Sequence, residues 1–216
     1  MSAYFVTATG TDIGKTFVTA GLIRHLRAQG RRVSALKPVI SGFDDVAGSD
    51  TAILLDALGE TATPEAVARL SPCRFTAPLS PDMAASRQGR RVDFAALVEF
   101  CRGADASGTL FIEGVGGIMV PLDDTHTVLD WMAALRLPLV LVAGSYLGTL
   151  SHTLTALRVI AAAKLDVAAL VVNESQGATV PLDETAATLA RFALGVPIVT
   201  LPRGAADFSP LAALLV

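Results

Sequence analysis

The sequence predicts an α/β fold in which a mostly parallel sheet is covered by helices on both faces. Hydrophobic residues make up 52% of the 216-residue chain, which is enough apolar surface for a substantial core. Short β-branched runs alternate with longer amphipathic stretches, and runs such as 139–142 are continuously apolar, as in strands buried on both faces. We expect a single domain spanning residues 1–216.

The expected strands are the short apolar runs, at 4–7, 33–36, 109–112, 139–142, 168–172 and 198–200. The first expected helix, 15–29, has Val18, Leu22 and Leu26 at helical spacing and is stopped by Gly30. Further helices are expected at 51–58, 94–102, 128–135, 150–163 and 183–193. Residues 59–92, with four prolines, are the least regular part, and we expect them to form an excursion over the sheet edge.

Composition excludes several classes of protein. The chain has 17 Lys and Arg against 20 Asp and Glu, a formal charge of −3, which argues against nucleic acid as the main partner. No apolar segment reaches the roughly 20 residues of a membrane span, and the apolar start lacks the basic flank of a signal peptide. We therefore expect a cytoplasmic protein that binds neither nucleic acid nor membrane.

In a parallel sheet, ligands bind beyond the carboxyl ends of the strands, and the motif Gly10-Thr11-Asp12-Ile13-Gly14-Lys15-Thr16 lies at such an end. It follows an expected strand and opens an expected helix, the context of a phosphate-binding loop. The common pattern has a glycine where Thr9 stands. Backbone N–H groups would hold phosphates, Lys15 would reach the β and γ phosphates, and Thr16 would bind Mg²⁺. The alternative is an ordinary glycine-rich turn with a solvated lysine.

A second constellation is Glu113 followed by Gly114-Val115-Gly116-Gly117, directly after the strand expected at 109–112. Glu113 suits a second Mg²⁺ ligand, and Asp50, near the start of a helix, could complete the oxygen shell. Glu113 could instead be a buried carboxylate paired with Lys15 or Lys37. Asp50 could be only a helix cap, as could its neighbour Ser49.

Two further segments contain candidate substrate-binding residues. Lys37 leaves a strand before Pro38 and adds a second cation to Lys15, which suits a transferring phosphoryl group, and Ser41 follows closely. The segment Gly148-Thr149-Leu150-Ser151 opens a helix whose free N–H groups could hold a small carboxylate. Plain capping by Thr149 is the alternative there.

Together these motifs resemble the dethiobiotin synthetase family, over nearly the whole chain. The resemblance rests, in order, on residues 4–7 with 11–16, then 37–42, 49–50, 78–81, 113–117, 147–152 and 172–173. It implies a P-loop NTPase fold and an ATP-dependent cyclo-ligase of biotin biosynthesis. That enzyme carboxylates 7,8-diaminopelargonate (7,8-diaminononanoate) with CO₂ and closes the ring, giving dethiobiotin, ADP and phosphate.

The resemblance also implies roles for individual residues. Lys15 and Lys37 would act on phosphates and the carbamate as catalytic residues, and Thr16, Asp50 and Glu113 would hold Mg²⁺. Ser41 and the segment Gly148, Thr149, Leu150 and Ser151 would bind the substrate. The family forms homodimers in which the partner subunit helps to bind the substrate carboxylate near this segment. The nucleotide site would comprise Thr11, Asp12, Ile13, Gly14, Lys15, Thr16, Phe17, Asp50, Glu113, Gly114, Val115, Gly116, Asn173, Glu174, Leu201, Pro202 and Arg203, with Asn173 reading adenine.

Three other functions share this fold. A partition-type ATPase switch, or another nucleotide-dependent regulator, would carry a second lysine early in the loop, and residues 10–12 supply none. A cobyric-acid type synthetase needs an attached glutaminase domain, for which 216 residues leave no room. A non-catalytic nucleotide-binding module fits the loop but leaves Lys37 and Ser41 unexplained.

Overall fold

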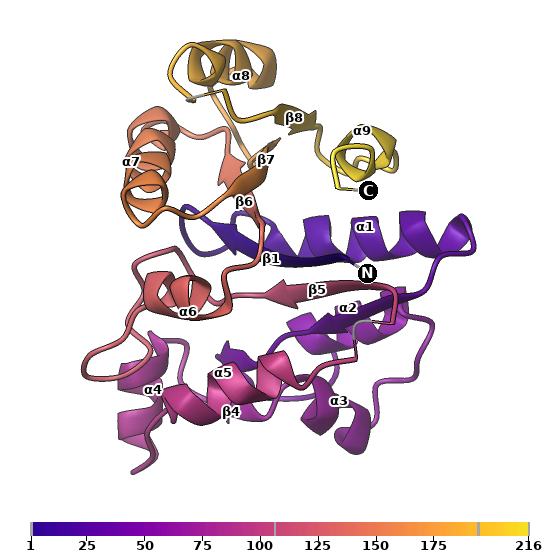
Figure 1. Ribbon diagram of the computed structural model, residues 1–216, viewed down its shortest axis with the longest axis vertical. Coiled ribbons are helices and arrows are strands. Elements are labelled where there is room, and N and C mark those ends of the chain that lie inside the picture. The colour runs from indigo at the N-terminus through magenta and orange to yellow at the C-terminus, as the bar shows by residue number, and fades with distance from the viewer. Residues whose placement is uncertain (1, 106, 194, 216) are drawn as a thin grey trace.

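The computed structural model describes residues 2–105, 107–193 and 195–215 (Figure 1). A six-stranded parallel sheet has the order β2-β5-β1-β6-β7-β8. Its strands are β1 (Ser2–Ala8), β2 (Val33–Leu36), β5 (Thr109–Glu113), β6 (Leu139–Gly144), β7 (Val167–Asn173) and β8 (Ile198–Leu201). A separate parallel pair consists of β3 (Val39–Ser41) and β4 (Cys73–Phe75). The parallel sheet expected from the sequence is confirmed.

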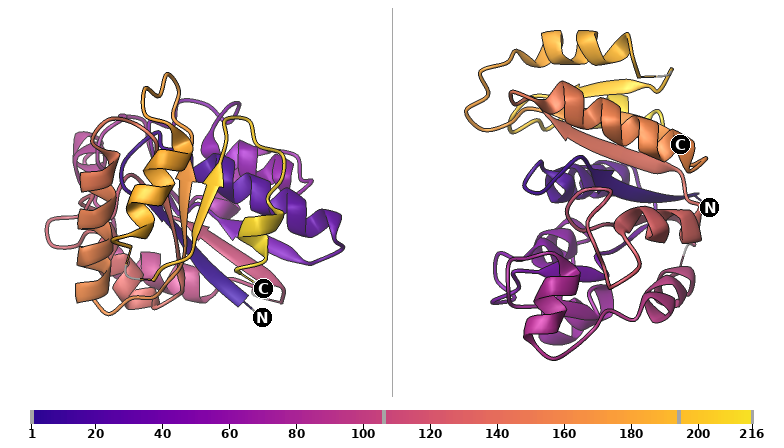
Figure 2. Two further views of the ribbon diagram at one scale, coloured as in Figure 1. Left: turned by 90° about the horizontal axis from the view of Figure 1, so that it is seen from above. Right: turned by 90° about the vertical axis from the view of Figure 1, so that its left-hand side faces the viewer.

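Helices cover both faces of the sheet, because its strands direct apolar residues alternately to either side (Figure 2). In β5, Leu110 and Ile112 contact one core and Phe111 the other. The first core is closed by α4 (Pro81–Arg87), α5 (Phe94–Arg102), α6 (Val128–Leu135), α7 (Thr149–Ala162) and α8 (Leu182–Ala190). The second is closed by α1 (Lys15–Ala28), α2 (Asp50–Ala57), α3 (Pro64–Leu70) and α9 (Ser209–Ala212).

The segment 59–92 is more regular than the sequence suggested. It contains α3, β4 and α4, and prolines stand at the first positions of both helices. Proline is favoured there because its missing N–H has no intrahelical partner at that position. Pro64 and Pro81 therefore begin helices, and the expectation of irregular chain is wrong for half of this segment. The short strand β3, which directly follows Lys37-Pro38, was also not expected.

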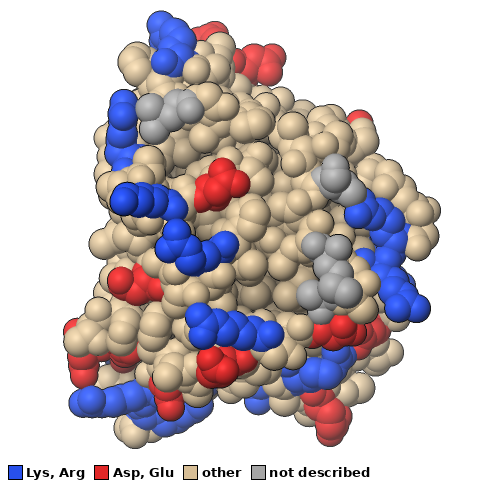
Figure 3. All heavy atoms as spheres, viewed as in Figure 1, with Lys and Arg blue, Asp and Glu red and all other residues tan. Residues whose placement is uncertain are grey.

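Charged side chains of both signs are interspersed on the face drawn in Figure 3, without a continuous basic surface on that face. Among the described residues, no helix is long and apolar enough to cross a membrane.

Candidate functional site: a phosphate loop and two buried lysines

The loop at residues 10–14 connects the end of the central strand β1 to the start of α1. Gly14 precedes the helix with a φ of 100°, a left-handed conformation that glycine adopts without strain. A Cβ atom at Gly14 would also lie 2.4 Å from the Asn173 side-chain nitrogen, so a larger residue does not fit. The first turn of α1 therefore opens with free N–H groups beside the loop, as an anion site requires.

Lys15 is the first residue of α1, and only 7% of it is exposed. Its Nζ donates to the carbonyl oxygen of Gly116 at 2.9 Å and to that of Gly10 at 3.3 Å. Gly116 belongs to the loop after β5, so Lys15 connects the ends of two neighbouring strands.

Glu113 is the last residue of β5. This strand lies in the sheet between β1, which leads to Lys15, and β2, which leads to Lys37. Its Oε1 accepts a hydrogen bond from the Thr16 hydroxyl at 2.7 Å and is 2.6 Å from Lys37 Nζ. The exposed fraction of Glu113 is 0% and that of Lys37 is 2%. Strand order thus places this carboxylate against both the phosphate loop and Lys37.

Asp50 completes this cluster from the start of α2. Its Oδ2 lies 2.9 Å from Lys37 Nζ, and its side chain is 42% exposed. Ser49 caps α2, since its hydroxyl accepts the Ala52 N–H at 3.2 Å. The capping role considered for both residues therefore falls to Ser49, and the Asp50 carboxylate faces Lys37.

Burial and neighbouring charge set the ionisation of the two lysines differently. Burial lowers the pKa of Lys15, and the charge of Lys37 lowers it further, to about 8. Burial also acts to lower the pKa of Lys37, but Glu113 and Asp50 outweigh it and raise that pKa. Burial alone would raise the pKa of Asp50, yet Lys37 holds it below its usual range. Lys37 therefore keeps its charge at neutral pH, whereas Lys15 titrates not far above it.

The cluster opens into a cleft of about 450 Å³, which we call the inner cleft. It contains the two lysines and the predicted residue Ser41, at the end of β3. Its lining includes Thr11, Asp12, Gly14, Lys15, Thr16, Lys37, Ser41, Asp50, Val115 and Gly116. The structure thus brings together most of the predicted phosphate, metal and catalytic residues.

A larger cleft of about 980 Å³, the outer cleft, lies on the other side of the loop. Asn173, at the end of β7, donates its amide N–H to the Ile13 carbonyl at 2.9 Å. Glu174 accepts the Arg203 backbone N–H at 2.8 Å, which joins the loops after β7 and β8. The outer cleft is lined by the predicted residues Thr11, Asp12, Ile13, Gly14, Phe17, Asn173, Glu174 and Arg203. The predicted residues Leu201 and Pro202 do not line it.

The segment predicted to bind the substrate carboxylate forms the start of α7. Gly148 precedes the helix with a φ of 99°, and no side chain caps it. Thr149 is buried, and its hydroxyl donates to the Gly144 carbonyl at 2.6 Å, so it does not cap the helix as the alternative had it. Residues Gly148, Thr149, Leu150 and Ser151 line neither the inner nor the outer cleft.

Several residues that line the outer cleft are not among the predicted site residues. Tyr146 and His152 both line it, and the Tyr146 hydroxyl lies 2.8 Å from His152 Nδ1. Ser175 and Gln176 also line it, directly after the predicted pair at 173–174. Extending the strand-end rule by two residues would have found Ser175, whose N–H donates to the Ser145 hydroxyl at 3.0 Å.

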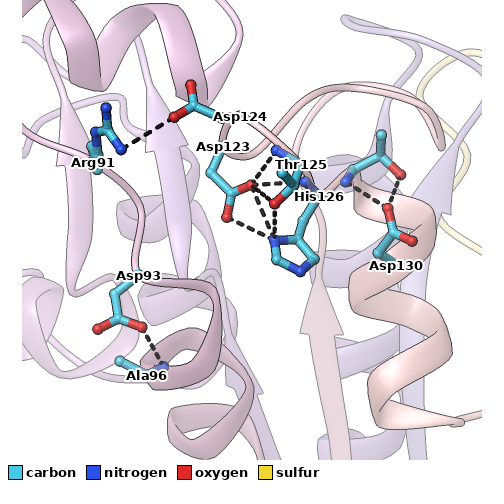
Figure 4. Close-up of polar contacts among 9 residues, drawn as sticks. Arg91, Asp93, Ala96, Asp123, Asp124, Thr125, His126 and Asp130 are labelled. Carbon is cyan, nitrogen blue, oxygen red and sulfur yellow. Dashed lines mark hydrogen bonds and ion pairs between the residues drawn. The ribbon is translucent and has the colours of Figure 1, made fainter.

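The long loop after Glu113 is fixed at its far end, before α6 (Figure 4). Asp123 Oδ1 accepts the N–H groups of Thr125 and His126 at 2.8 and 2.7 Å. The His126 ring stacks on Phe94, with ring centroids 3.9 Å apart. Asp130 accepts both the N–H and the hydroxyl of Thr127 at 2.7 Å. These contacts hold the loop that supplies Gly114 and Gly116 to the two lysines.

Comparison with known proteins identifies the family. The family model described as "AAA domain" matches residues 2–201. An ATP-dependent dethiobiotin synthetase from Acidiphilium cryptum is 52% identical over 196 residues, 88% of each chain. One from Methylobacterium nodulans is 50% identical over 213 residues, 94% of each chain. This chain belongs to the dethiobiotin synthetase family.

Membership of the dethiobiotin synthetases confirms the resemblance, and it assigns the chain to the ATP-dependent ligases of biotin biosynthesis. Solved structures show the shared fold. The hydrogenase maturation factor HypB from Archaeoglobus fulgidus superposes with a TM-score of 0.60 at 13% identity, covering 100% of this chain and 88% of its own. The cell division ATPase MinD from Pyrococcus furiosus gives 0.55 at 17% identity, covering 96% and 84%.

These identities bear on the alternative of an ATPase switch. The likeness to MinD, at 17% identity, extends to the fold alone. The relatives at about 50% identity are dethiobiotin synthetases, so a partition-type switch is not favoured.

Proposed function

We propose that this chain converts 7,8-diaminopelargonate, CO₂ and ATP into dethiobiotin, ADP and phosphate. The observation that supports this most is the inner cleft, where two buried lysines flank one space beside a phosphate loop. A nucleotide-binding module or a switch needs the loop lysine, but it has no use for a second buried cation at the end of β2. Transfer of a phosphoryl group to an anionic acceptor needs both.

The reaction follows three steps. One amine of the substrate adds to CO₂ and loses a proton, giving a carbamate. A carbamate oxygen attacks the γ-phosphorus of ATP, ADP leaves, and a carbamic–phosphoric mixed anhydride forms. The second amine then attacks the carbonyl carbon and expels phosphate, which closes the five-membered urea. A carbamate reverts readily in water, so the site must hold it beside the nucleotide until phosphorylation.

The residues of the inner cleft fall into two groups, one that would bind the ATP phosphates and one that would bind the carbamate. The N–H groups at the start of α1 and the Lys15 ammonium would hold the β and γ phosphates. Lys37, from the end of β2, would face the carbamate and the transferring phosphoryl group, with Ser41 beside it in the same cleft. Positioning the two reactants and offsetting their charge supplies the catalysis.

On the opposite side of the loop, the outer cleft would take the adenosine. Its volume of about 980 Å³ suits a nucleoside, and Asn173 is already fixed at its floor by the Ile13 carbonyl. Phe17 and Arg203 line the same cleft.

The cluster around Glu113 fits Mg²⁺. A hydroxyl and two carboxylates are oxygen donors of the kind that Mg²⁺ prefers, together with waters and phosphates. The Glu113 Oε2 atom is buried and has no hydrogen-bond partner among the described residues, as expected of an oxygen kept for a cation. We infer that Thr16, Asp50 and Glu113 hold the ion, which when bound offsets charge on the phosphate oxygens.

We infer that the active unit is a homodimer. Leu147 and Met119 are exposed apolar side chains, 85% and 54% exposed, near the start of α7. Met119 also lines an apolar groove of about 490 Å³, together with Ile118 and Val159 of α7. A partner subunit on this surface would bring its own α7 start, Gly148–Ser151, to the substrate.

Mixing two inactive variants, Lys15→Met and Ser151→Glu, tests the shared site. The mixture should regain about a quarter of the activity, because half of the dimers are heterodimers and each heterodimer has one intact site of two. Mixtures without activity contradict the shared site.

The proposed reaction is tested by product. Purified protein is incubated with ATP, Mg²⁺, bicarbonate and diaminopelargonate, and both ADP and the ureido product are measured. We expect ADP release only with both co-substrates, in a 1:1 ratio to dethiobiotin. ADP release that is independent of the diamine would contradict the proposal and favour an ATPase switch. Nucleotide binding without turnover would favour a non-catalytic nucleotide-binding module.

A further inference from the structure

Within the described part of the chain, the Lys37 ammonium has three oxygen partners around it. Its Nζ lies 2.6 Å from Glu113 Oε1, 3.0 Å from the Gly114 carbonyl and 2.9 Å from Asp50 Oδ2. An ammonium group has three N–H donors: two make hydrogen bonds to Glu113 and Gly114, and the ion pair with Asp50 takes the remaining side of the group. A lysine in this state cannot bind an incoming carbamate or phosphate unless it releases one of its partners.

Lys15 differs in this respect. It donates to two backbone carbonyls, those of Gly10 and Gly116, and forms no ion pair with a carboxylate of the described residues. One donor thus remains for a phosphate without any exchange. The two lysines of the inner cleft are therefore prepared differently, one ready for its anion and the other held by carboxylates.

The partner that Lys37 can release is Asp50. Glu113 is completely buried at the end of a central strand, and the Gly114 carbonyl is backbone. Asp50 is 42% exposed at the rim of the inner cleft, on the first turn of a helix. Its carboxylate can turn toward a divalent cation in the cleft.

We propose that Lys37 is an internal competitor of the divalent cation: it holds the Asp50 carboxylate in the cation-free enzyme and releases it when the cation binds. This rests on the assignment of Thr16, Asp50 and Glu113 as the cation's ligands in the proposed function. A divalent cation and an ammonium repel each other at contact distance, so they cannot both keep the same carboxylate oxygens. Cation arrival thereby frees one donor of Lys37 for the substrate, and the free cation alone binds weakly.

The test uses Mn²⁺ as the probe, without nucleotide, and follows free Mn²⁺ by electron paramagnetic resonance. Lys37→Met should bind Mn²⁺ at least about tenfold more tightly than the unaltered protein, because the competing cation is gone. Lys15→Met is the matched control, since it removes a buried lysine of the same cleft that touches no carboxylate. We expect it to tighten Mn²⁺ binding less than Lys37→Met does, because Lys15 is not paired with either carboxylate and acts on the cation only through its charge. If Mn²⁺ binding tightens equally in both variants, the effect comes from net charge alone and the proposal is wrong. Unchanged or weaker Mn²⁺ binding by Lys37→Met would also overturn it.

Thermal unfolding gives a second measurement and checks folding. In chelator, Lys37→Met leaves two carboxylates facing each other, so its Tm should fall and Mn²⁺ should restore it more than it raises the Tm of the unaltered protein. If Lys37→Met does not fold without metal, Lys37→Gln keeps polar contacts while removing the charge, and the same tightening is expected. Equal Mn²⁺-induced shifts in variant and unaltered protein contradict the exchange.

Glu113→Gln separates the two possible failures. If Mn²⁺ binding disappears in Glu113→Gln but is not tightened by Lys37→Met, the ligand assignment stands and only the exchange is wrong. If Mn²⁺ binding survives Glu113→Gln unchanged, the ligand assignment fails and the exchange with it.

Discussion

The inner and outer clefts lie on either side of one loop, yet they are organised in opposite ways. In the inner cleft, charged side chains bind each other: Lys37 contacts Glu113 and Asp50, and Thr16 contacts Glu113. In the outer cleft, side chains such as Asn173 and Glu174 bind backbone groups instead. The inner cleft is built by strand order, because β5 separates β1 from β2. The outer cleft is built by the loops after β6, β7 and β8.

This contrast teaches where function should be sensitive to substitution. Changes in the inner cleft disturb a buried charge cluster and should act on turnover or on the cation. Changes in the outer cleft remove single polar contacts and should act on nucleotide affinity. Four substitutions test the contrast, in decreasing order of expected effect.

Lys37→Gln should have the largest effect, a loss of turnover of about 10²-fold or more, the scale of removing one preorganised electrostatic group. ATP should still bind, through Lys15 and the loop amides. Lys37→Arg should restore activity only in part, since a forked guanidinium does not reproduce a compact ammonium. Titration calorimetry with ATP and assay of ureido product measure the two properties. Normal ureido synthesis by Lys37→Gln would show that Lys37 is only a strand-end lysine.

Glu113→Gln should raise the Mg²⁺ concentration needed for half-maximal activity by about tenfold or more, because a neutral amide is a poorer ligand for a hard cation. The circular dichroism spectrum should be unchanged, since Gln keeps the shape of the buried side chain. Asp123→Asn, at the far end of the same loop and outside the cluster, is the matched control and should leave the Mg²⁺ titration unchanged. A wild-type Mg²⁺ titration by Glu113→Gln would refute the ligand assignment.

Asn173→Ala should raise the KM for ATP about fivefold and leave kcat nearly unchanged, as expected when one hydrogen bond of about 1 kcal/mol is lost. The reason is that Asn173 lies in the outer cleft, away from the reacting groups. Steady-state kinetics with varied ATP separates the two constants. A fall in kcat with constant KM would mean that the outer cleft takes part in chemistry, which would erase the contrast between the two clefts.

Lys15 gives a pH dependence of stability, an effect on folding and not on turnover. Its pKa is about 8 in the folded protein against a usual value of 10.5. Between these pH values the unfolded chain binds more protons, so the free energy of unfolding should rise with pH through this window. Lys15→Met lacks this slope and should be more stable at pH 7, by about 3 kcal/mol. Urea unfolding of both proteins at pH 7 and pH 9.5 measures the difference, and parallel pH profiles would contradict it.

The inner cleft could be predicted from the sequence because strand ends meet at one edge of a parallel sheet. Lys37 and Glu113 stand at such ends, and Lys15 follows the loop after β1. The structure brings Lys37 to Glu113 and Gly114, and Lys15 to Gly116 of the same loop. The pairing of Glu113 with Lys37, considered as an alternative to metal binding, is present. The three-way contact with Asp50 could not be derived, because it depends on where α2 starts relative to β2.

The helices within residues 59–92 and the contacts at the start of α7 could not be predicted, because the same residue type is favoured in two different local structures. Pro64 and Pro81 suggested irregular chain, yet proline is also favoured at the first helical position. Thr149 suggested a helix cap, yet its hydroxyl binds the Gly144 carbonyl of the preceding strand.

The place of β5 between β1 and β2 also matters for how the protein folds. Lys37 and Glu113 are 76 residues apart in sequence, and Thr16 and Glu113 are 97 apart. During synthesis, β1 and β2 emerge first and cannot pair with each other in the native sheet, because the slot between them belongs to a strand made later. Contacts of such long range form slowly, and unpaired strand edges favour aggregation until they close. A nascent chain that ends before residue 109 therefore holds both lysines but has nothing to bring them together.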